Sequence, residues 1–147
     1  AGEGQYQDAG AKIIHMAPHT RSYIISKSIA RKGGVTSYRG LLKVLKGAYN
    51  TYARVQCDAL LLDEKSYNKT YPTIIVNEQA ADTGHEASVS NINDDQLLYL
   101  MSRGFSEQKS QSMIINGFID LFVQELPMEY AVEINRLIAH EMEGSIG

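Results

Sequence analysis

The chain has 147 residues, 44% of them hydrophobic, with 14 basic residues against 17 acidic ones. This length permits one domain, or a β part with a helical appendage, and a substantial core. The net charge of -3 argues against a general electrostatic grip on nucleic acid or an anionic membrane, and no apolar run approaches the roughly 20 residues that span a bilayer. We expect a soluble, cytoplasmic protein that binds neither nucleic acid nor membrane.

The chain begins with a polar, glycine-rich stretch. It starts at Ala1 without a methionine and leads directly into the strand-like run from Lys12 to Met16. A fragment cut at a loop would look like this, so we expect a piece of a longer protein.

Residues 12–90 carry short bursts of β-branched and aromatic residues, namely Ile13-Ile14, Tyr23-Ile24-Ile25, 37–41, 53–57 and 73–76. Turn signals separate them at 17–19, 32–34, 46–48, 63–66 and 77–78. This punctuation is typical of an all-β sandwich, barrel or solenoid. Adjacent bulky pairs, and the lack of Asn-Gly or Asp-Gly in this part, suit stacked parallel coils. The pattern alone leaves solenoid and sandwich equally open.

Basic residues gather between Arg21 and Lys46, where they alternate with apolar positions. Such alternation favours the outward faces of strands over a phosphate-binding stripe. The sequence contains no nucleotide-binding loop and no hydrolase motif. The Gly33-Gly34 pair lacks the lysine and helix that would follow in a phosphate-binding loop. We therefore expect a chain that hydrolyses no nucleotide by itself.

After Ser90 the hydrophobic period becomes helical. Asn93 or Asp94 can cap a first helix, whose apolar face is Leu97, Leu98, Leu100 and Met101, before Gly104 stops it. We predict a domain boundary here, with a β part over residues 1–91 and a helical part over 92–147.

Two further helices complete the helical part. Ser106 can cap the second, which contains Gly117, and a glycine at that position predicts a close packing contact. Pro127 suits the first turn of the third helix, and Gly144 suits its end. The apolar positions expected to face inward on this third helix are Ala131, Ile134, Leu137, Ile138 and Met142.

Cys57 is the only cysteine, which excludes an internal disulfide. It lies in a strand pattern with Val55 and Ala59 at the same phase. The simplest interpretation is a small buried hydrophobe, since free cysteine is among the most buried residue types. A nucleophile or metal ligand would have to be a thiolate, which requires a positive or metallated neighbour.

His85 and Glu86 form an adjacent pair, whose side chains would project to opposite faces of a strand. Its simplest interpretation is a hydrogen-bonded surface pair. Cysteine, histidine and carboxylate together suit a borderline-soft metal such as iron or zinc. The remaining histidines are interpreted as structural, at positions His15, His19 and His140.

Several motifs along the whole chain, in the same order, resemble the C-terminal part of SufB in the SufB/SufD family of iron–sulfur cluster assembly scaffolds. They are Tyr38-Arg39-Gly40, 56–60, His85-Glu86-Ala87, 95–104, 125–131 and the ending 143–147. The resemblance implies a right-handed parallel β-helix followed by a helical C-terminal domain. It also implies a scaffold without enzymatic activity of its own, with the ATPase activity residing in SufC.

The same resemblance implies partners and a site. SufD would pair through the β-helix, SufC would dock on the C-terminal helices, and a cysteine desulfurase with its sulfur-transfer partner would supply persulfide sulfur. Cys57 matches the family's sulfur acceptor, and Cys57, His85 and Glu86 would hold the transient iron–sulfur cluster. Where family members often have glutamate, this chain has Gly84. A reduced flavin in the full complex stays open.

Two expectations remain beside this one. The alternative is a SufD-like structural subunit, in which Cys57 is core packing and ligates nothing. Without its normal partner the chain would expose a β-helix edge, and such an edge can pair with a copy of itself. We therefore expect a homo-oligomer of the fragment, formed through the strands around Cys57.

Overall fold

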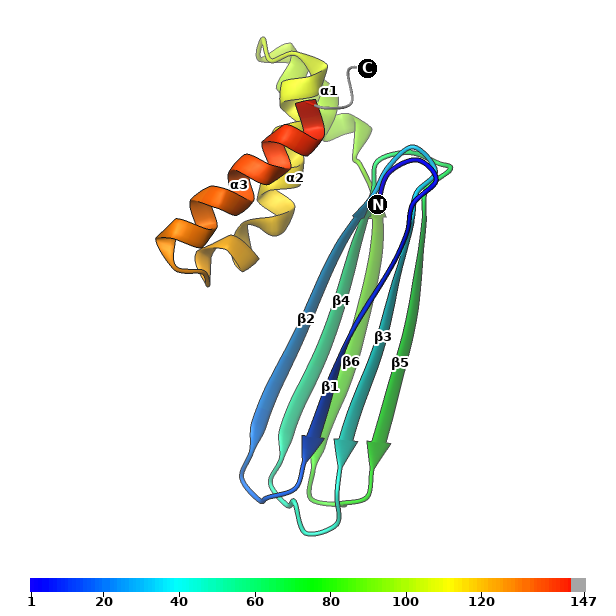
Figure 1. Ribbon diagram of the computed structural model, residues 1–147, viewed down its shortest axis with the longest axis vertical. Coiled ribbons are helices and arrows are strands. Elements are labelled where there is room, and N and C mark those ends of the chain that lie inside the picture. Colours follow the sequence, from blue (N-terminus) through cyan, green and yellow to red (C-terminus); the bar gives the residue numbers. More distant parts are fainter. Residues whose placement is uncertain (144–147) are drawn as a thin grey trace. The chain divides into compact units, whose positions relative to one another are not determined.

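The computed structural model describes residues 1–143, except for the side chains of Leu121, Ala139 and residues 141–143. The chain forms two compact units, Ala1–Asn91 and Ile92–Gly147. The first consists of strands and the second of helices (Figure 1). No helix among the described residues is long and apolar enough to cross a membrane.

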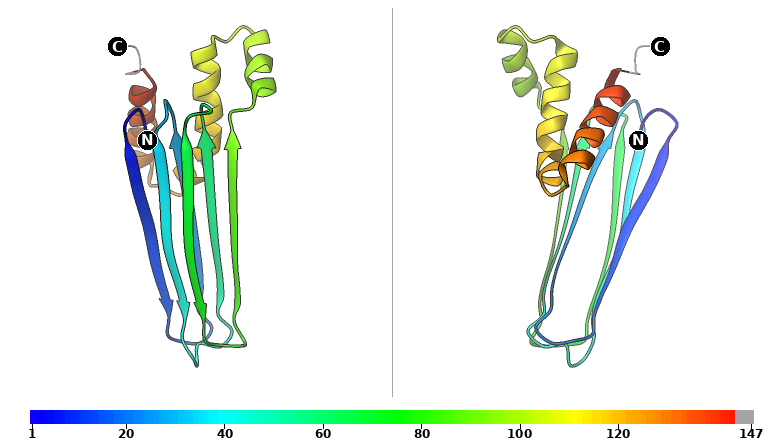
Figure 2. Two further views of the ribbon diagram at one scale, coloured as in Figure 1. Left: turned by 90° about the vertical axis from the view of Figure 1, so that its right-hand side faces the viewer. Right: turned by 60° about the vertical axis from the view of Figure 1, so that its left-hand side comes forward.

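The first unit contains six strands of equal length, which are β1 (Tyr6–His15), β2 (Arg21–Ala30), β3 (Val35–Val44), β4 (Tyr52–Leu61), β5 (Tyr67–Val76) and β6 (Asp82–Asn91). Odd-numbered strands form one sheet in the order β1-β3-β5, and even-numbered strands form the other in the order β2-β4-β6. All pairings are parallel, and the two sheets lie as two layers (Figure 2). The predicted mainly β class and its parallel strand pairing are confirmed.

Register is uniform through both sheets. Tyr6 pairs with Val35, which pairs with Tyr67, and no bulge interrupts either sheet's ten-residue pairings. Because the chain alternates between sheets, each strand stacks on the strand two positions earlier. Parallel strands of this kind are stabilised by apolar side chains that face the other sheet. The hydrophobic runs around Ile24 and Val55 supply such side chains.

Hydrogen bonds join the turns that follow neighbouring strands of one sheet. The Asp63 carboxylate accepts hydrogen bonds from the backbone N–H groups of Lys32, Lys65 and Ser66. On another corner, Glu78 accepts from the N–H of Gly47 at 2.9 Å. Both carboxylates fall in stretches that the sequence marks as turns, and each joins the turns after two neighbouring strands of one sheet.

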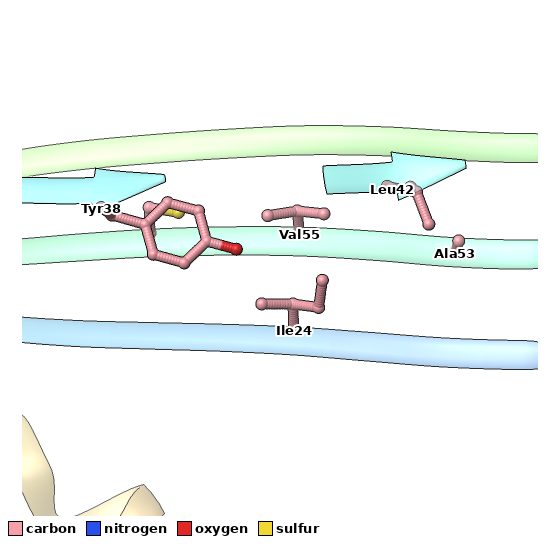
Figure 3. Packing of buried hydrophobic residues seen from close by; sticks show 6 residues of the cluster. Ile24, Tyr38, Leu42, Ala53 and Val55 are labelled. Carbon is pink, nitrogen blue, oxygen red and sulfur yellow. The ribbon is translucent and has the colours of Figure 1, made fainter. Parts of the chain in front are cut away.

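The core of the first unit lies between the two sheets. Its buried residues come from β2, β3 and β4 (Figure 3). They are Ile24, Tyr38, Leu42, Ala53, Val55 and Cys57. Ala11 and Ile13 of β1 pack against them. The core is therefore composed mainly of residues from the central strands β3 and β4, and β5 and β6 contribute more exposed side chains.

The second unit contains α1 (Asp94–Ser102), α2 (Glu107–Gln124) and α3 (Met128–Glu143). Asn93 caps α1 by accepting from the N–H of Asp95, and Ser106 caps α2 by accepting from the N–H of Lys109, as predicted. Gly104 follows α1 with a φ of 95°, which suits glycine.

Two predictions about this unit are wrong. A Cβ at Gly117 would meet nothing within 4 Å, so glycine there serves no close packing contact. Leu137 was expected to face inward but is 55% exposed. Helical periodicity identifies an apolar face without showing whether the chain itself covers that face. The predicted end at Gly144 lies outside the described residues, as does the side chain of Met142.

Candidate functional site around Cys57

Cys57 lies in β4, the central strand of its sheet, and is 5% exposed. Its side chain shares the interior face with Val55, because alternate strand residues point the same way. Burial raises the pKa of this thiol from 9.0 to about 11, with a smaller contribution from the negative charge of Asp58. Near neutral pH the side chain is therefore a protonated, protected thiol, and it needs help to become a nucleophile.

Tyr38 of β3 is the aromatic residue in the buried cluster that contains Cys57. Tyr38 is also 5% exposed, and its hydroxyl has no hydrogen-bond partner among the described residues. Burial, and secondly the charge of an ionised Cys57, raises the pKa of Tyr38. The hydroxyl is directed along the interior toward Val55 and Ile24 (Figure 3).

Gly40 explains how Tyr38 fits. A Cβ at Gly40 would lie 2.4 Å from the Tyr38 hydroxyl oxygen and 2.7 Å from Cε1 of its ring. The tyrosine thus lies along its own strand over the position two residues later, where only glycine leaves room. The Tyr38-Arg39-Gly40 motif is a steric unit that positions one aromatic ring.

Polar side chains occupy the interior beyond the thiol. Asn68 Nδ2 donates to the hydroxyls of Ser28, at 3.2 Å, and Thr36, at 2.9 Å. Thr36 also donates to Ser28, so this network joins the two sheets. Ser26 is the register partner of Cys57 and lies two residues before Ser28. Cys57 consequently lies where the apolar part of the interior meets a hydrogen-bonded polar part.

His85 of β6 lies on the interior face with Cys57. It pairs with Val55, whereas Cys57 pairs with Ala87, so the offset is one strand and two residues. With a strand spacing of about 4.8 Å and a rise of about 3.3 Å per residue, the two Cα atoms are about 8 Å apart. The Nε2 atom of His85 is buried without a hydrogen-bond partner in the described chain.

Glu86 projects to the other face. It pairs with the exposed Gln56 and is itself exposed. Cys57 and Glu86 therefore lie on opposite sides of the sheet in this conformation. Among the side chains that the structure describes, no group of three or more from His, Cys, Asp and Glu is placed to hold a metal ion. The structure brings Cys57 and His85 to one face and leaves Glu86 apart from them.

Gly84 lies under the side chain of Arg54. A Cβ at Gly84 would meet Arg54 Cδ at 3.2 Å and Nε at 3.3 Å. Arg54 extends over the glycine to an ion pair with Asp82, in which Nη2 donates to both carboxylate oxygens, at 2.9 and 3.0 Å. The lack of a side chain at Gly84 therefore leaves room for the aliphatic part of Arg54 on the outer face of the sheet.

Asp58 anchors the outer face directly behind Cys57. It accepts hydrogen bonds from Ser88 Oγ at 2.7 Å, Gln56 Nε2 at 2.9 Å and Lys27 Nζ at 3.3 Å. Burial by itself raises the pKa of Asp58, but the bonds from Ser88 and Lys27 outweigh it and lower this pKa below its usual value. These bonds join all three strands of the sheet at the level of the thiol.

Sequence reasoning found Cys57, His85 and Glu86 as candidates but missed this supporting set. Tyr38 and Asp58 were noted only as parts of motifs. The sequence cue that could have identified Tyr38 and Asp58 is their position, because Tyr38 lies two residues before Gly40 and Asp58 directly follows Cys57. The partners of Asp58, among them Lys27, could not be found without the register of the sheet.

The fold and site define a parallel two-sheet β scaffold that holds one protected thiol. Residues 1–118 match the family model described as "SUF system FeS cluster assembly, SufBD core domain". The chain belongs to this family of iron–sulfur cluster assembly proteins.

Relatives of named function agree with this family. Over 147 residues the chain is 52% identical to the iron–sulfur cluster assembly protein SufB of Bacillus subtilis. It is 53% identical to an iron–sulfur cluster assembly SufBD family protein of Mycobacterium tuberculosis and 52% identical to one of Staphylococcus aureus. All of this chain is covered in each case, but it spans only 32%, 17% and 32% of the respective relatives' lengths.

Proposed function

We propose that this chain is the sulfur-accepting part of a SufB-type scaffold, on which an iron–sulfur cluster is built and from which it is transferred. The carrying observation is the placement of Cys57, the only thiol, at the boundary between the apolar and polar parts of the interior. Family membership supplies the chemistry of the substrate, namely sulfur and iron.

Sulfur would arrive as a persulfide carried by a cysteine desulfurase and its sulfur-transfer partner. The Cys57 sulfur attacks the terminal sulfur of the donor, a new S–S bond forms, and the donor's own S–S bond breaks. The donor leaves as a thiol that takes the Cys57 proton, so atoms and electrons balance. The raised pKa of Cys57 means that an approaching donor or base must first promote its ionisation.

Iron would then be held by Cys57, His85 and Glu86, the thiolate, imidazole and carboxylate of one assembly site. Because Glu86 faces away from Cys57, these three cannot close on one ion within the described conformation. The proposal therefore requires β6 to move, or a partner subunit to supply ligands at this edge. β6 pairs on one side only, which leaves its other edge open for such a partner.

We further propose that the two sheets are coils of a right-handed parallel β-helix that pairs with SufD, and that the helical unit docks SufC, the ATPase. Support for docking comes from large apolar side chains more than half exposed on the helices, which are Leu98, Tyr99, Phe122, Met128, Tyr130, Val132 and Leu137. We assign no flavin to this chain.

The strands through which the fragment was expected to self-associate need correction. β4, the strand that carries Cys57, is paired on both sides and offers no free edge. The open edges belong to β1 and β2 at one end of the unit and to β5 and β6 at the other. A homo-oligomer of the fragment would therefore form through these strands.

A second candidate is a SufD-like structural subunit with no ligands of its own. The burial of Cys57 and its raised pKa favour this alternative. Anaerobic reconstitution of the intact complex with SufC and SufD, followed by iron and sulfide analysis, separates the two. Loss of cluster in Cys57→Ser, and in the His85→Ala, Glu86→Ala double variant, supports the scaffold. Cluster content equal to wild type in both variants establishes the structural subunit instead.

A further inference from the structure

Tyr38 presents a hydrogen-bond donor in the interior that no group of the described chain uses. A buried hydroxyl without a partner costs free energy, on the order of 1–3 kcal/mol. Phenylalanine would fill the same volume without that cost. The hydroxyl is therefore unexplained by packing, although Tyr38 is 5% exposed and belongs to the core.

The orientation of Tyr38 is enforced by its strand. Gly40 leaves the only room for the ring, since any Cβ there would come within 2.4 Å of the hydroxyl oxygen. The side chain thus points along the interior toward Val55 (Figure 3). His85 pairs with Val55, and its Nε2 atom is likewise buried without a hydrogen-bond partner in the described residues.

Cys57 and Tyr38 pack in one cluster. Among the described residues the Tyr38 hydroxyl has no hydrogen-bond partner, the Cys57 sulfur included. A second sulfur bonded to Sγ would extend the cysteine by about 2 Å. A terminal sulfur that extends along the interior toward Val55 would approach the Tyr38 hydroxyl, which has no partner among the described residues.

We propose that Tyr38 is a positioning residue that donates a hydrogen bond to the terminal sulfur of a Cys57 persulfide, with His85 Nε2 as the second polar group of that interior site. The inference rests on the proposed function, because it concerns the sulfur that Cys57 accepts. A persulfide is more acidic than its parent thiol, so its terminal sulfur ionises more readily, and a hydrogen-bond donor beside it stabilises the ionised form. Hydrogen bonds to charged groups are the stronger ones.

Tyr38→Phe tests this assignment, because it removes only the hydroxyl. The intact protein is loaded by a cysteine desulfurase, its sulfur-transfer partner and cysteine, and excess thiol is then added. Mass spectrometry follows the tryptic peptide of residues 55–65, which contains Cys57, as it loses one sulfur. We expect loss about tenfold faster in Tyr38→Phe, the size of one charge-assisted hydrogen bond.

Controls separate this role from packing. Tyr23→Phe removes a hydroxyl from a 62% exposed side chain and should keep the wild-type rate. Thermal unfolding should show Tyr38→Phe at least as stable as wild type, because a buried unpartnered hydroxyl is lost. Equal persulfide lifetimes in wild type and Tyr38→Phe overturn the role of Tyr38 alone. A wild-type peptide that never gains sulfur overturns the proposed function, and this inference with it.

Discussion

The protected state of Cys57 predicts slow reaction with alkylating reagents. Only the thiolate reacts, and a rise of the thiol pKa from 9.0 to about 11 lowers the thiolate fraction at pH 8 from about a tenth to about a thousandth. Iodoacetamide should therefore modify the folded chain about 100-fold more slowly than the chain unfolded in urea. The side chain's exposure of 5% adds a steric delay to this electrostatic one.

The assay is simple because the chain has no other cysteine. Mass spectrometry of the whole chain follows the reaction from pH 7 to pH 11, and the rate should rise about tenfold per pH unit without levelling near 9. Folding is checked at each pH by circular dichroism. A folded chain whose rate levels off near pH 9, or which matches the unfolded rate at pH 8, would refute the assignment of a buried, neutral thiol.

Three further predictions concern stability, each measured by urea unfolding. The unfolded Cys57 thiol ionises before the folded one, so the free energy of unfolding should be fully present below pH 9 and fall by about 2–3 kcal/mol as the pH rises to 11; Cys57→Ala should flatten this fall, and an unchanged slope would contradict it. Lys27→Met leaves the Asp58 carboxylate, 11% exposed, without its cation and should cost about 3 kcal/mol, partly restored by adding Asp58→Asn; a cost below about 1 kcal/mol would show that the pair is solvated. Gly40→Ala should cost about 1–3 kcal/mol through collision with Tyr38, and Tyr38→Leu should relieve it; wild-type stability in Gly40→Ala would disprove the steric account.

The strands and turns of the first unit were largely predictable because their cues are local. Bursts such as Tyr23-Ile24-Ile25 mark strands, and Lys32-Gly33 marks a turn in which both residues have positive φ. β6 was less visible, since Asp82–Asn91 is polar and contains no aromatic residue apart from the imidazole of His85. Its strand conformation comes from pairing with β4, a non-local cause that no window of sequence contains.

Helix boundaries followed from capping chemistry, whereas helix burial did not follow from periodicity. Asn93 and Ser106 satisfy the first N–H groups of their helices through their own side chains, so the sequence suffices to place them. Leu137 satisfies the same apolar period as Ile134, yet it is exposed while Ile134 is partly buried. Which part of an apolar stripe is covered depends on neighbours that the period does not name.

The candidate site divides along the same line. Cys57 could be selected from sequence because it is unique, and alternation correctly placed His85 and Glu86 on opposite faces. Which of the two shares a face with Cys57 depends on the register of β4 and β6, and that register places His85 there. An assembly site that uses all three residues must therefore involve both faces of one sheet. Of the two strands that carry these residues, β4 pairs with a strand on each side, whereas β6 pairs with β4 alone. Movement of β6 therefore breaks the hydrogen bonds of one strand pair, and movement of β4 breaks those of two.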